Sequence, residues 1–350
     1  MLREFARRVR LLLFGFRPDP IRGSVRQMGP PPLPDLTHSF PFDPAYGYSL
    51  DGLRAIQPPV GPPGFRTFWE ARYREAVRLS ADPWLGPTRA GPSGWLVRDL
   101  SYRSTGDFTI RGWLAEPADG VVTRGLVLGH GYGGCDGPDF ALATAGTALI
   151  TPCFRGLALS QRAPISADPS YHVLHDIQDR DRYILGGCVE DLWLAVSALL
   201  EIHPQVQGRV GYAGISFGGG IGALALPWEL RVARGALTVP TFGHQPLRLT
   251  LHSTGSGEWV RRFAREHGNI TATLAYYDAA VAARHIEMPM LVAAARFDPV
   301  VPPPGQFAIF NALPGAKELF VLDAGHFEWP GRAAQEQALT AAVRAFFERL

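Results

Sequence analysis

Short apolar runs alternate with helical segments from about residue 95 onward, and this alternation limits the fold more than any other feature. Continuous apolar runs suit strands that are buried on both faces of a parallel sheet. We place such strands at 125–129, 148–151, 210–213, 290–295 and 319–322, and helices at 189–202, after Ser216, near 305–312 and at the C-terminus. The pattern therefore predicts an α/β fold with a mostly parallel central sheet and helices on both faces.

The residues before this alternation have a different character. Residues 17–64 are proline-rich and irregular, which predicts an arm that wraps around the domain. Aromatic and apolar residues at helical spacing predict a helix over 65–77 that packs on the core. Residues 96–102 and 109–115 predict a pair of strands joined by the turn at 104–107.

The 350 residues are enough for one large domain with additions. We expect a basic N-terminal extension at 1–40 and one α/β domain at 41–350. Helical and loop segments of mixed character interrupt the alternation at 225–285, so we expect an insertion or lid there.

The N-terminal segment is basic. Residues 1–26 contain seven arginines against Glu4 and Asp19, a net charge of +5, which leaves −3 for the remainder of a chain whose total is +2. Its apolar run at 11–16 is shorter than the roughly 7–15 residues of a secretory signal, and no stretch reaches the roughly 18 apolar residues of a membrane span. As a helix the segment is amphipathic. Two interpretations stay open: peripheral membrane contact through residues 1–16, or docking on its own domain or a neighbouring subunit.

Composition excludes several classes of protein. Hydrophobic residues make up 46% of the chain and charged residues 19%, which excludes disorder over most of its length. A net charge of +2 is too small for an extended nucleic-acid surface, so we expect no nucleic-acid partner. Three cysteines, Cys135, Cys153 and Cys188, are too few for a disulfide framework, so we expect a reducing, cytoplasmic setting.

The sequence contains no motif that is specific for a metal. His172 and His175 lie close to Asp176, but there is no H-E-x-x-H pattern and no paired cysteine spacing. We interpret the two histidines as part of a surface helix turn and expect neither a metal nor an organic cofactor.

A G-x-S-x-G pattern stands at Gly214–Gly218, with Ser216 at its centre. It follows an apolar strand and begins a helix that is rich in small residues. This strand–turn–helix context is typical of a nucleophile elbow, in which a tight turn exposes the serine hydroxyl above the sheet and leaves no room for side chains at the flanking glycines. We therefore predict that Ser216 is a nucleophile.

A serine nucleophile needs a base to take its proton and a carboxylate to orient that base. In this kind of fold the carboxylate comes later in the chain than the serine, and the histidine comes last. Asp298 follows the predicted strand at 290–295, and His326 follows the predicted strand at 319–322. Their order and placement predict a triad of Ser216, Asp298 and His326.

A glycine-rich loop, Gly129-His130-Gly131-Tyr132-Gly133-Gly134, follows the predicted strand at 125–129. Glycines allow backbone amides to approach a substrate closely, which suits an oxyanion hole. We predict the amides of Tyr132 and Phe217 as donors and His130 as a hydrogen-bonded organiser of the loop. The loop does not cradle phosphate, since no Gly-Lys-Ser/Thr follows.

These residues resemble the acetyl xylan esterase and cephalosporin C deacetylase family of α/β-hydrolases over roughly residues 42–350. The matching motifs occur in order along the chain: Phe68-Trp69-Glu70, His130-Gly131-Tyr132, Val239-Pro240-Thr241-Phe242, Tyr276-Tyr277-Asp278, Met288-Pro289, Asp298-Pro299-Val300-Val301-Pro302, Phe307-Ala308-Ile309 and Gly325-His326-Phe327. The resemblance implies an α/β-hydrolase fold, deacetylation of small esters by Ser216, Asp298 and His326, and a homo-oligomer.

The chain departs from the family at three places. The family has glutamine after the nucleophile, where this chain has Phe217, and a backbone amide survives that change. The family's Arg-Gly-Gln reads Arg155-Gly156-Leu157, which keeps the cationic residue and loses its amide neighbour. The basic N-terminal extension is the third departure.

We therefore expect a serine ester hydrolase that removes acetyl or other short acyl groups from small esters or acetylated sugars. Two alternatives stay open. The same triad serves longer-chain esterases and peptidases. A hydrolase scaffold that has lost its activity can also act as a membrane-docked or partner-binding protein. The natural alcohol, the choice between polymeric and small substrates, and the oligomer size do not follow from the sequence.

Overall fold

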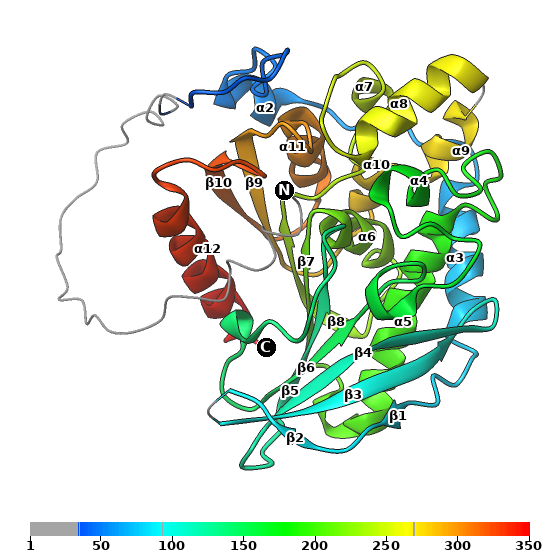
Figure 1. The fold of residues 1–350 in the computed structure, drawn as a ribbon, viewed down its shortest axis with the longest axis vertical. Helices are drawn as coiled ribbons and strands as arrows, with labels where there is room; N and C mark the ends of the chain where they lie inside the picture. Colours follow the sequence, from blue (N-terminus) through cyan, green and yellow to red (C-terminus); the bar gives the residue numbers. More distant parts are fainter. Residues whose placement is uncertain (1–33, 35, 93, 269) are drawn as a thin grey trace, which may run out of the picture.

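A ten-stranded sheet forms the centre of the computed structural model (Figure 1), which describes residues 34, 36–92, 94–268 and 270–350. The strands are β1 (Trp84–Leu85), β2 (Arg89–Ala90), β3 (Trp95–Ser104), β4 (Phe108–Pro117), β5 (Arg124–Gly129), β6 (Thr147–Pro152), β7 (Val210–Ile215), β8 (Val232–Thr238), β9 (Met290–Phe297) and β10 (Lys317–Ala324). Their order across the sheet is β1-β3-β4-β6-β5-β7-β8-β9-β10, with β2 paired to β3.

The sheet is parallel in its larger part and antiparallel at one end. Every neighbouring pair from β6 to β10 is parallel. The pairs β1–β3, β2–β3, β3–β4 and β4–β6 are antiparallel. The chain reverses between β3 and β4 at Gly106, whose φ of 64° is readily adopted by glycine. The mostly parallel sheet confirms the predicted fold class.

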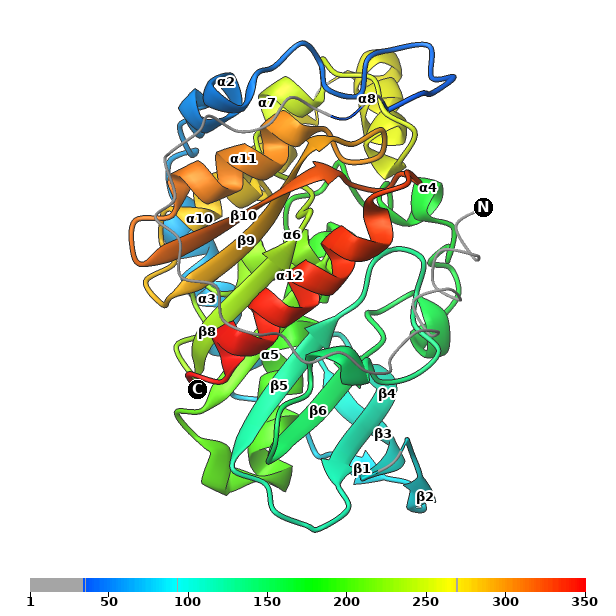
Figure 2. The same cartoon turned by 90° about the vertical axis from the view of Figure 1, so that its left-hand side faces the viewer.

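Helices cover both faces of this sheet. They are α2 (Leu50–Ala55), α3 (Phe65–Ala76), α4 (Pro169–His172), α5 (Ile184–Ile202), α6 (Phe217–Ala225), α7 (Gln245–Arg248), α8 (Ser256–His267), α9 (Thr271–Tyr276), α10 (Ala279–Ala283), α11 (Pro303–Ala312) and α12 (Arg332–Phe347), with short 3₁₀ turns at Phe140–Leu142, Ala158–Ser160 and Pro204–Val206. Figure 2 shows α12 in front of the sheet, with α3, α5 and α6 behind it. No helix in the described part of the chain is long and apolar enough to cross a membrane.

Alternating strand residues divide the core between the two faces. In β5, Leu126 and Leu128 pack in the cluster that contains Phe346 of α12, whereas Val127 packs in the larger cluster with α5 and α6. This division follows from the period of two in a strand, because both faces of a parallel sheet are covered. It explains why the strands appear in the sequence as continuous apolar runs.

Most predicted elements are present with small changes in their limits. The helix predicted over 65–77 is α3, the pair of strands at 96–102 and 109–115 is β3–β4, and the helix predicted over 189–202 is α5, which begins five residues earlier. A short helix, α2, lies within the segment predicted to be irregular.

β8 was not predicted, and it lies within the segment expected to be an insertion. β8 pairs with both β7 and β9, so residues 232–238 belong to the sheet itself. Its alternating small and apolar residues give a weaker signal than the continuous runs of its neighbours. The helices between β8 and β9 extend from Gln245 to Ala283. A lid role for this segment stays a prediction, and the helix predicted over residues 1–16 lies outside the described residues.

Candidate active site

β7 leads into α6 through a single residue, Ser216. Its backbone has φ 53° and ψ −108°, a combination that few residues with a side chain adopt. A Cβ added to Gly214 would lie 2.5 Å from the carbonyl oxygen of Gly218, and one added to Gly218 would overlap the carbonyl group of Gly129. The two glycines of the pattern therefore allow the close contact of strand, helix and loop, as predicted for a nucleophile elbow.

His326 connects this serine to a buried carboxylate. Its Nε2 lies 3.0 Å from Ser216 Oγ, and its Nδ1 lies 2.8 Å from Asp298 Oδ2. Because a carboxylate accepts hydrogen bonds, Nδ1 donates to Asp298, and Nε2 is left to accept from the serine hydroxyl. The three side chains come from the C-terminal ends of β7, β9 and β10, which the parallel strands bring to one edge of the sheet.

Asp298 has 0% exposed surface, and the described partners of its carboxylate are hydrogen-bond donors. Oδ1 accepts from the backbone amides of Val300 and Val301, each at 2.9 Å. Oδ2 accepts from His326 and from Gln306 Nε2 at 3.0 Å. A buried carboxylate with four donors is held in one orientation, so the imidazole ring that it contacts is held as well.

Gln306 is a residue at this site that sequence reasoning missed. It lies on α11 and is completely buried. Its Nε2 also donates to the carbonyl oxygen of Val301 at 2.7 Å, and its Oε1 accepts from the amide of Ala295 at 2.8 Å. The one sequence signal was a glutamine, eight residues after Asp298, in a helix whose other residues before Asn311 are apolar.

The glycine-rich loop lies beside the serine. A Cβ added to Gly131 would lie 3.6 Å from Ser216 Cβ, so the backbone passes within contact distance of this side chain. The loop turns with a bond from the amide of Gly134 to the carbonyl of Gly131 at 3.0 Å. Within the described residues, the amides of Tyr132 and Phe217 donate to no other group, so both are free for an incoming oxygen.

His130 organises this loop, as expected. Its Nε2 accepts from the amide of Phe154 at 3.1 Å, so its Nδ1 carries the proton and donates to the carbonyl of Gly131 at 2.7 Å. Burial lowers the pKa of His130 to about 4, so the ring is neutral near pH 7. Its own carbonyl accepts from the amide of Gly218 at 3.0 Å, which connects the loop to the start of α6.

The prediction for His172 was wrong. This histidine was expected in a surface helix turn, yet it is completely buried at the end of α4. Its Nε2 donates to the carbonyl of Arg155 at 2.9 Å, which leaves Nδ1 to accept from the hydroxyl of Tyr132 at 3.1 Å. Burial lowers its pKa to about 4, so it too is neutral near pH 7. The Tyr132 ring also packs on the Phe217 ring, with centroids 4.1 Å apart.

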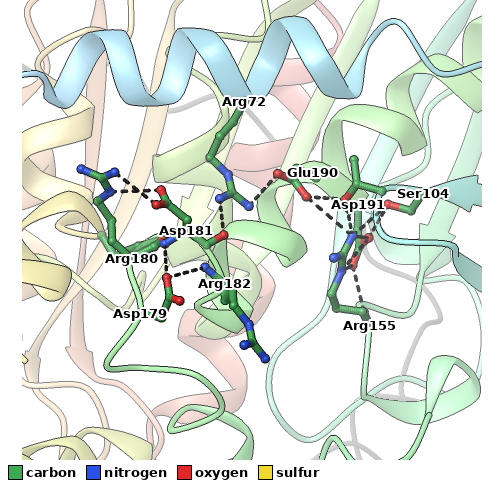
Figure 3. Close-up of polar contacts among 11 residues, drawn as sticks. Arg72, Ser104, Arg155, Asp179, Arg180, Asp181, Arg182, Glu190 and Asp191 are labelled. Carbon is green, nitrogen blue, oxygen red and sulfur yellow. Dashed lines mark hydrogen bonds and ion pairs between the residues drawn. The ribbon is translucent and has the colours of Figure 1, made fainter.

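Arg155 and Asp191 form a buried ion pair within a cluster of polar contacts (Figure 3). Arg155 Nη2 lies 2.6 Å from Asp191 Oδ1, and Nη2 also donates to Ser104 Oγ at 3.1 Å. Next to them, Glu190 pairs with Arg72 of α3 at 2.6 Å. These pairs connect α3, α5, β3 and the segment after β6. Because the carbonyl of Arg155 holds His172, the network also reaches Tyr132.

The proline-rich arm borders the site from the other side. The carbonyl of Pro44 accepts from the amide of Asp298 at 3.1 Å. The Phe40 ring lies 6.1 Å from the Phe327 ring, next to the histidine, and the His38 ring lies 5.4 Å from the Phe297 ring. The arm therefore packs on the two loops that carry the carboxylate and the histidine.

The sheet order and the elbow define an α/β-hydrolase, and the paired serine and histidine at its edge are those of the serine hydrolases. The sequence profile of the family described as acetyl xylan esterase (AXE1) matches residues 48–342. The chain belongs to this family and is a hydrolytic esterase, as the resemblance of its motifs implied.

Solved structures share the fold. The acetyl xylan esterase from Paenibacillus sp. R4 has 22% identity and a TM-score of 0.71, over 84% of this chain and 99% of that one. Acetyl xylan esterase 1 from Thermoanaerobacterium sp. JW/SL YS485 has 21% identity and a TM-score of 0.73, over 86% and 99%. An acylaminoacyl peptidase from Pyrococcus horikoshii has 15% identity and a TM-score of 0.55, over 76% and 49%.

Proposed function

We propose that the protein removes acetyl and other short acyl groups from esters, with Ser216 as the nucleophile, His326 as the general base and acid, and Asp298 as the group that orients the histidine. The observation that carries this proposal is the path of hydrogen bonds from Ser216 Oγ through His326 to the buried carboxylate. Membership in the acetyl xylan esterase family supports an acetyl ester as the substrate.

In the first half of the reaction, Ser216 Oγ attacks the ester carbonyl carbon while its proton moves to His326 Nε2. The imidazolium that forms is stabilised by Asp298, which keeps its charge throughout. When the tetrahedral intermediate collapses, the proton moves from Nε2 to the departing alkoxide, and the alcohol leaves. The acyl group stays on Ser216 as an ester.

In the second half, a water molecule takes the position of the alcohol. His326 removes its proton, hydroxide attacks the acyl carbon, and the carboxylic acid leaves as the proton returns to Ser216 Oγ. In both halves, the amides of Tyr132 and Phe217 donate to the negatively charged oxygen. Removal of one such donor costs about 2.7–4 kcal/mol in comparable sites.

The experiment that tests this proposal measures hydrolysis of p-nitrophenyl acetate, butyrate and octanoate. We expect the rate to fall with acyl length and to vanish in Ser216→Ala, whereas Ser80→Ala, at an exposed serine outside the site, keeps the full rate. Preference for octanoate would replace the short-acyl substrate by a longer one. Full activity in Ser216→Ala would refute the nucleophile.

Acetylated sugars and simple acetyl esters are distinguished in a second step. We propose an acetylated sugar as the natural substrate, because the family and the two esterases reported above are described as acetyl xylan esterases. Acetate release from acetylated xylan, acetylated xylo-oligosaccharides and glucose pentaacetate is compared at equal acetyl concentration. Absence of acetate release from every one of these carbohydrates would argue against a sugar.

We also propose that the protein is a cytoplasmic homo-oligomer, which the family resemblance and the low cysteine content support. Light scattering of the full chain gives the mass of the particle, and a monomeric mass would refute the oligomer.

Liposome co-sedimentation of the full chain and of a chain without residues 1–30 tests membrane contact. Equal behaviour of the two would leave protein docking as the role of this segment.

A further inference from the structure

Three potential metal ligands meet at the base of the glycine-rich loop: His130, Cys135 and Cys153. One ligand atom from each lies within 4.8 Å of the other two. His130 is the second residue of the loop, Cys135 directly follows it, and Cys153 comes directly after β6. The sequence did not reveal this cluster, because the tertiary fold and not a short local spacing brings the residues together.

The two sulfur atoms are already spaced as a shared metal requires. They lie 3.9 Å apart. Two thiolates that each lie about 2.3 Å from one tetrahedral Zn²⁺ are about 3.8 Å from each other. A metal ion can therefore enter between them with little movement of either sulfur.

Coordination by the third ligand, His130, breaks an existing hydrogen bond. His130 Nε2 accepts from the amide of Phe154, which directly follows Cys153, so Nε2 faces the segment that carries this sulfur. Coordination through Nε2 uses the lone pair that accepts this hydrogen bond. Cys153 is completely buried, while Cys135 is half-buried and gives a metal ion access from solvent.

We propose that His130, Cys135 and Cys153 bind a thiophilic divalent metal ion such as Zn²⁺, and that binding inhibits the esterase. Each thiol releases one proton and becomes a thiolate ligand, the neutral imidazole donates its lone pair, and no group is oxidised or reduced. The ligand set of two sulfurs and one nitrogen favours Zn²⁺ or Cd²⁺ over Mg²⁺ or Ca²⁺, which prefer oxygen.

Inhibition follows from the position of the cluster, and this part of the inference rests on the proposed function. His130 and Cys135 lie on either side of the part of the loop that contains Tyr132. When His130 releases the Phe154 amide, the loop moves, and the Tyr132 amide leaves the position that the proposed function gives it as an oxyanion donor. Loss of one oxyanion donor lowers kcat by about 100-fold or more.

Binding and inhibition are measured separately on the full-length reduced protein under anaerobic conditions. CdCl₂ is titrated while the ultraviolet thiolate-to-cadmium charge-transfer band is recorded, and hydrolysis of p-nitrophenyl acetate is followed in parallel. We expect the band to saturate at one Cd²⁺ per chain, kcat to fall by about 100-fold at saturation, and EDTA to restore it. ZnCl₂ inhibits in the same way, whereas MgCl₂ does not.

The three cysteines provide the matched variants. We expect Cys135→Ala and Cys153→Ala to lose both the band and the inhibition. Cys188→Ala, at a completely buried cysteine on α5 outside the cluster, keeps both. Circular dichroism confirms that each variant is folded, and the half-buried Cys135 gives the variant that disturbs the core least.

Each other outcome overturns a defined part of the inference. Absence of the band in the wild-type chain, or a full band in Cys135→Ala, refutes the metal site. A band without inhibition refutes the coupling to the loop while leaving the metal site intact. An inactive protein before metal is added refutes the proposed function instead. One free thiol in place of three in the protein as isolated, titrated before the reductant is added, indicates a Cys135–Cys153 disulfide and refutes metal binding as the role of the pair.

Discussion

Two of the aspartates that the structure describes have 0% exposed surface, and their partners differ in one respect. Asp298 contacts the imidazole of His326 at 2.8 Å, and Asp191 contacts the guanidinium of Arg155 at 2.6 Å. Both carboxylates have further donors, so neither lacks hydrogen bonds. The difference lies in the group that each one faces, since an imidazole can accept and release a proton during a reaction, whereas a guanidinium stays protonated.

The chemistry of the partner separates a structural carboxylate from the one proposed for catalysis. Burial alone would lower the pKa of Arg155, but the charge and hydrogen bonds of Asp191 raise it above its ordinary value, so the guanidinium keeps its proton. The pair holds α5 against the segment after β6 and transfers no proton. Asp298 instead orients a ring whose other nitrogen faces a hydroxyl, and so a proton can move there.

The largest expected effect comes from Asp298→Asn. The amide side chain keeps the size of the carboxylate but removes its charge and favours the wrong tautomer of His326. We expect kcat to fall by about 10⁴-fold, with a much smaller change in the free energy of unfolding. Steady-state kinetics and urea unfolding measure the two effects. A kcat within tenfold of the wild type would remove Asp298 from the proposed mechanism.

Asp191→Asn provides the opposite half of the comparison. It leaves the buried guanidinium of Arg155 without its carboxylate, and removal of one partner from a buried pair costs about 3–5 kcal/mol. We expect the free energy of unfolding to fall by that amount. At a temperature where the variant is folded, kcat should stay within about tenfold of the wild type. A large loss of kcat at full stability would place Asp191 in the reaction path.

Histidines extend the comparison to pH. His172 faces a backbone carbonyl and a tyrosine hydroxyl, and burial lowers its pKa from 6.5 to about 4. Between pH 6.5 and 4, His172 binds a proton in the unfolded chain but not in the folded chain. The contribution of His172 to the free energy of unfolding is therefore complete above pH 6.5 and is lost as the pH falls from 6.5 to 4.

We expect the loss of unfolding free energy from pH 7.5 to pH 5 to be about 2 kcal/mol smaller in His172→Gln than in the wild type. Glutamine keeps one donor for the Arg155 carbonyl and one acceptor for Tyr132. The control is His267→Gln, at an exposed histidine of α8, which should leave the loss unchanged. Urea unfolding at both pH values tests this, and equal losses in all three proteins would mean that the protonated ring is accommodated in the folded state.

The smallest expected effect comes from Gln306→Leu. The change removes one donor to Asp298 while the backbone amides of Val300 and Val301 continue to hold Oδ1. We expect kcat to fall by about tenfold, corresponding to one neutral hydrogen bond to a charged group. Gln306→Glu, which presents an acceptor to Asp298 in place of a donor, should lower kcat further. A kcat unchanged in both variants would limit Gln306 to packing.

The sequence predicted the parts of the site whose geometry is local. Ser216 follows from the glycines on either side of it, because the strand, the turn and the helix all lie within a few residues. Asp298 and His326 follow from their places after apolar runs, because the C-terminal ends of parallel strands meet at one edge.

The parts that sequence reasoning missed depend on distant contacts. His172 was placed on the surface because its neighbours along the chain are polar, yet its partners, Arg155 and Tyr132, come from two other segments. β8 was missed because its small residues resemble a loop, and its place in the sheet is determined by β7 and β9. The ion pair of Arg155 and Asp191 likewise joins residues 36 positions apart.

The hydrogen bond from Asp298 to Pro44 has a consequence for the order in which the protein becomes active. The two residues are 254 positions apart (298 − 44), so at about 5–20 residues per second the ribosome adds Asp298 roughly 13–50 seconds after Pro44. During that time the arm has no finished site to pack on. The nascent chain consequently carries its serine before it carries a working esterase, and activity first appears when the arm around Pro44 meets the late segments that carry Asp298 and His326.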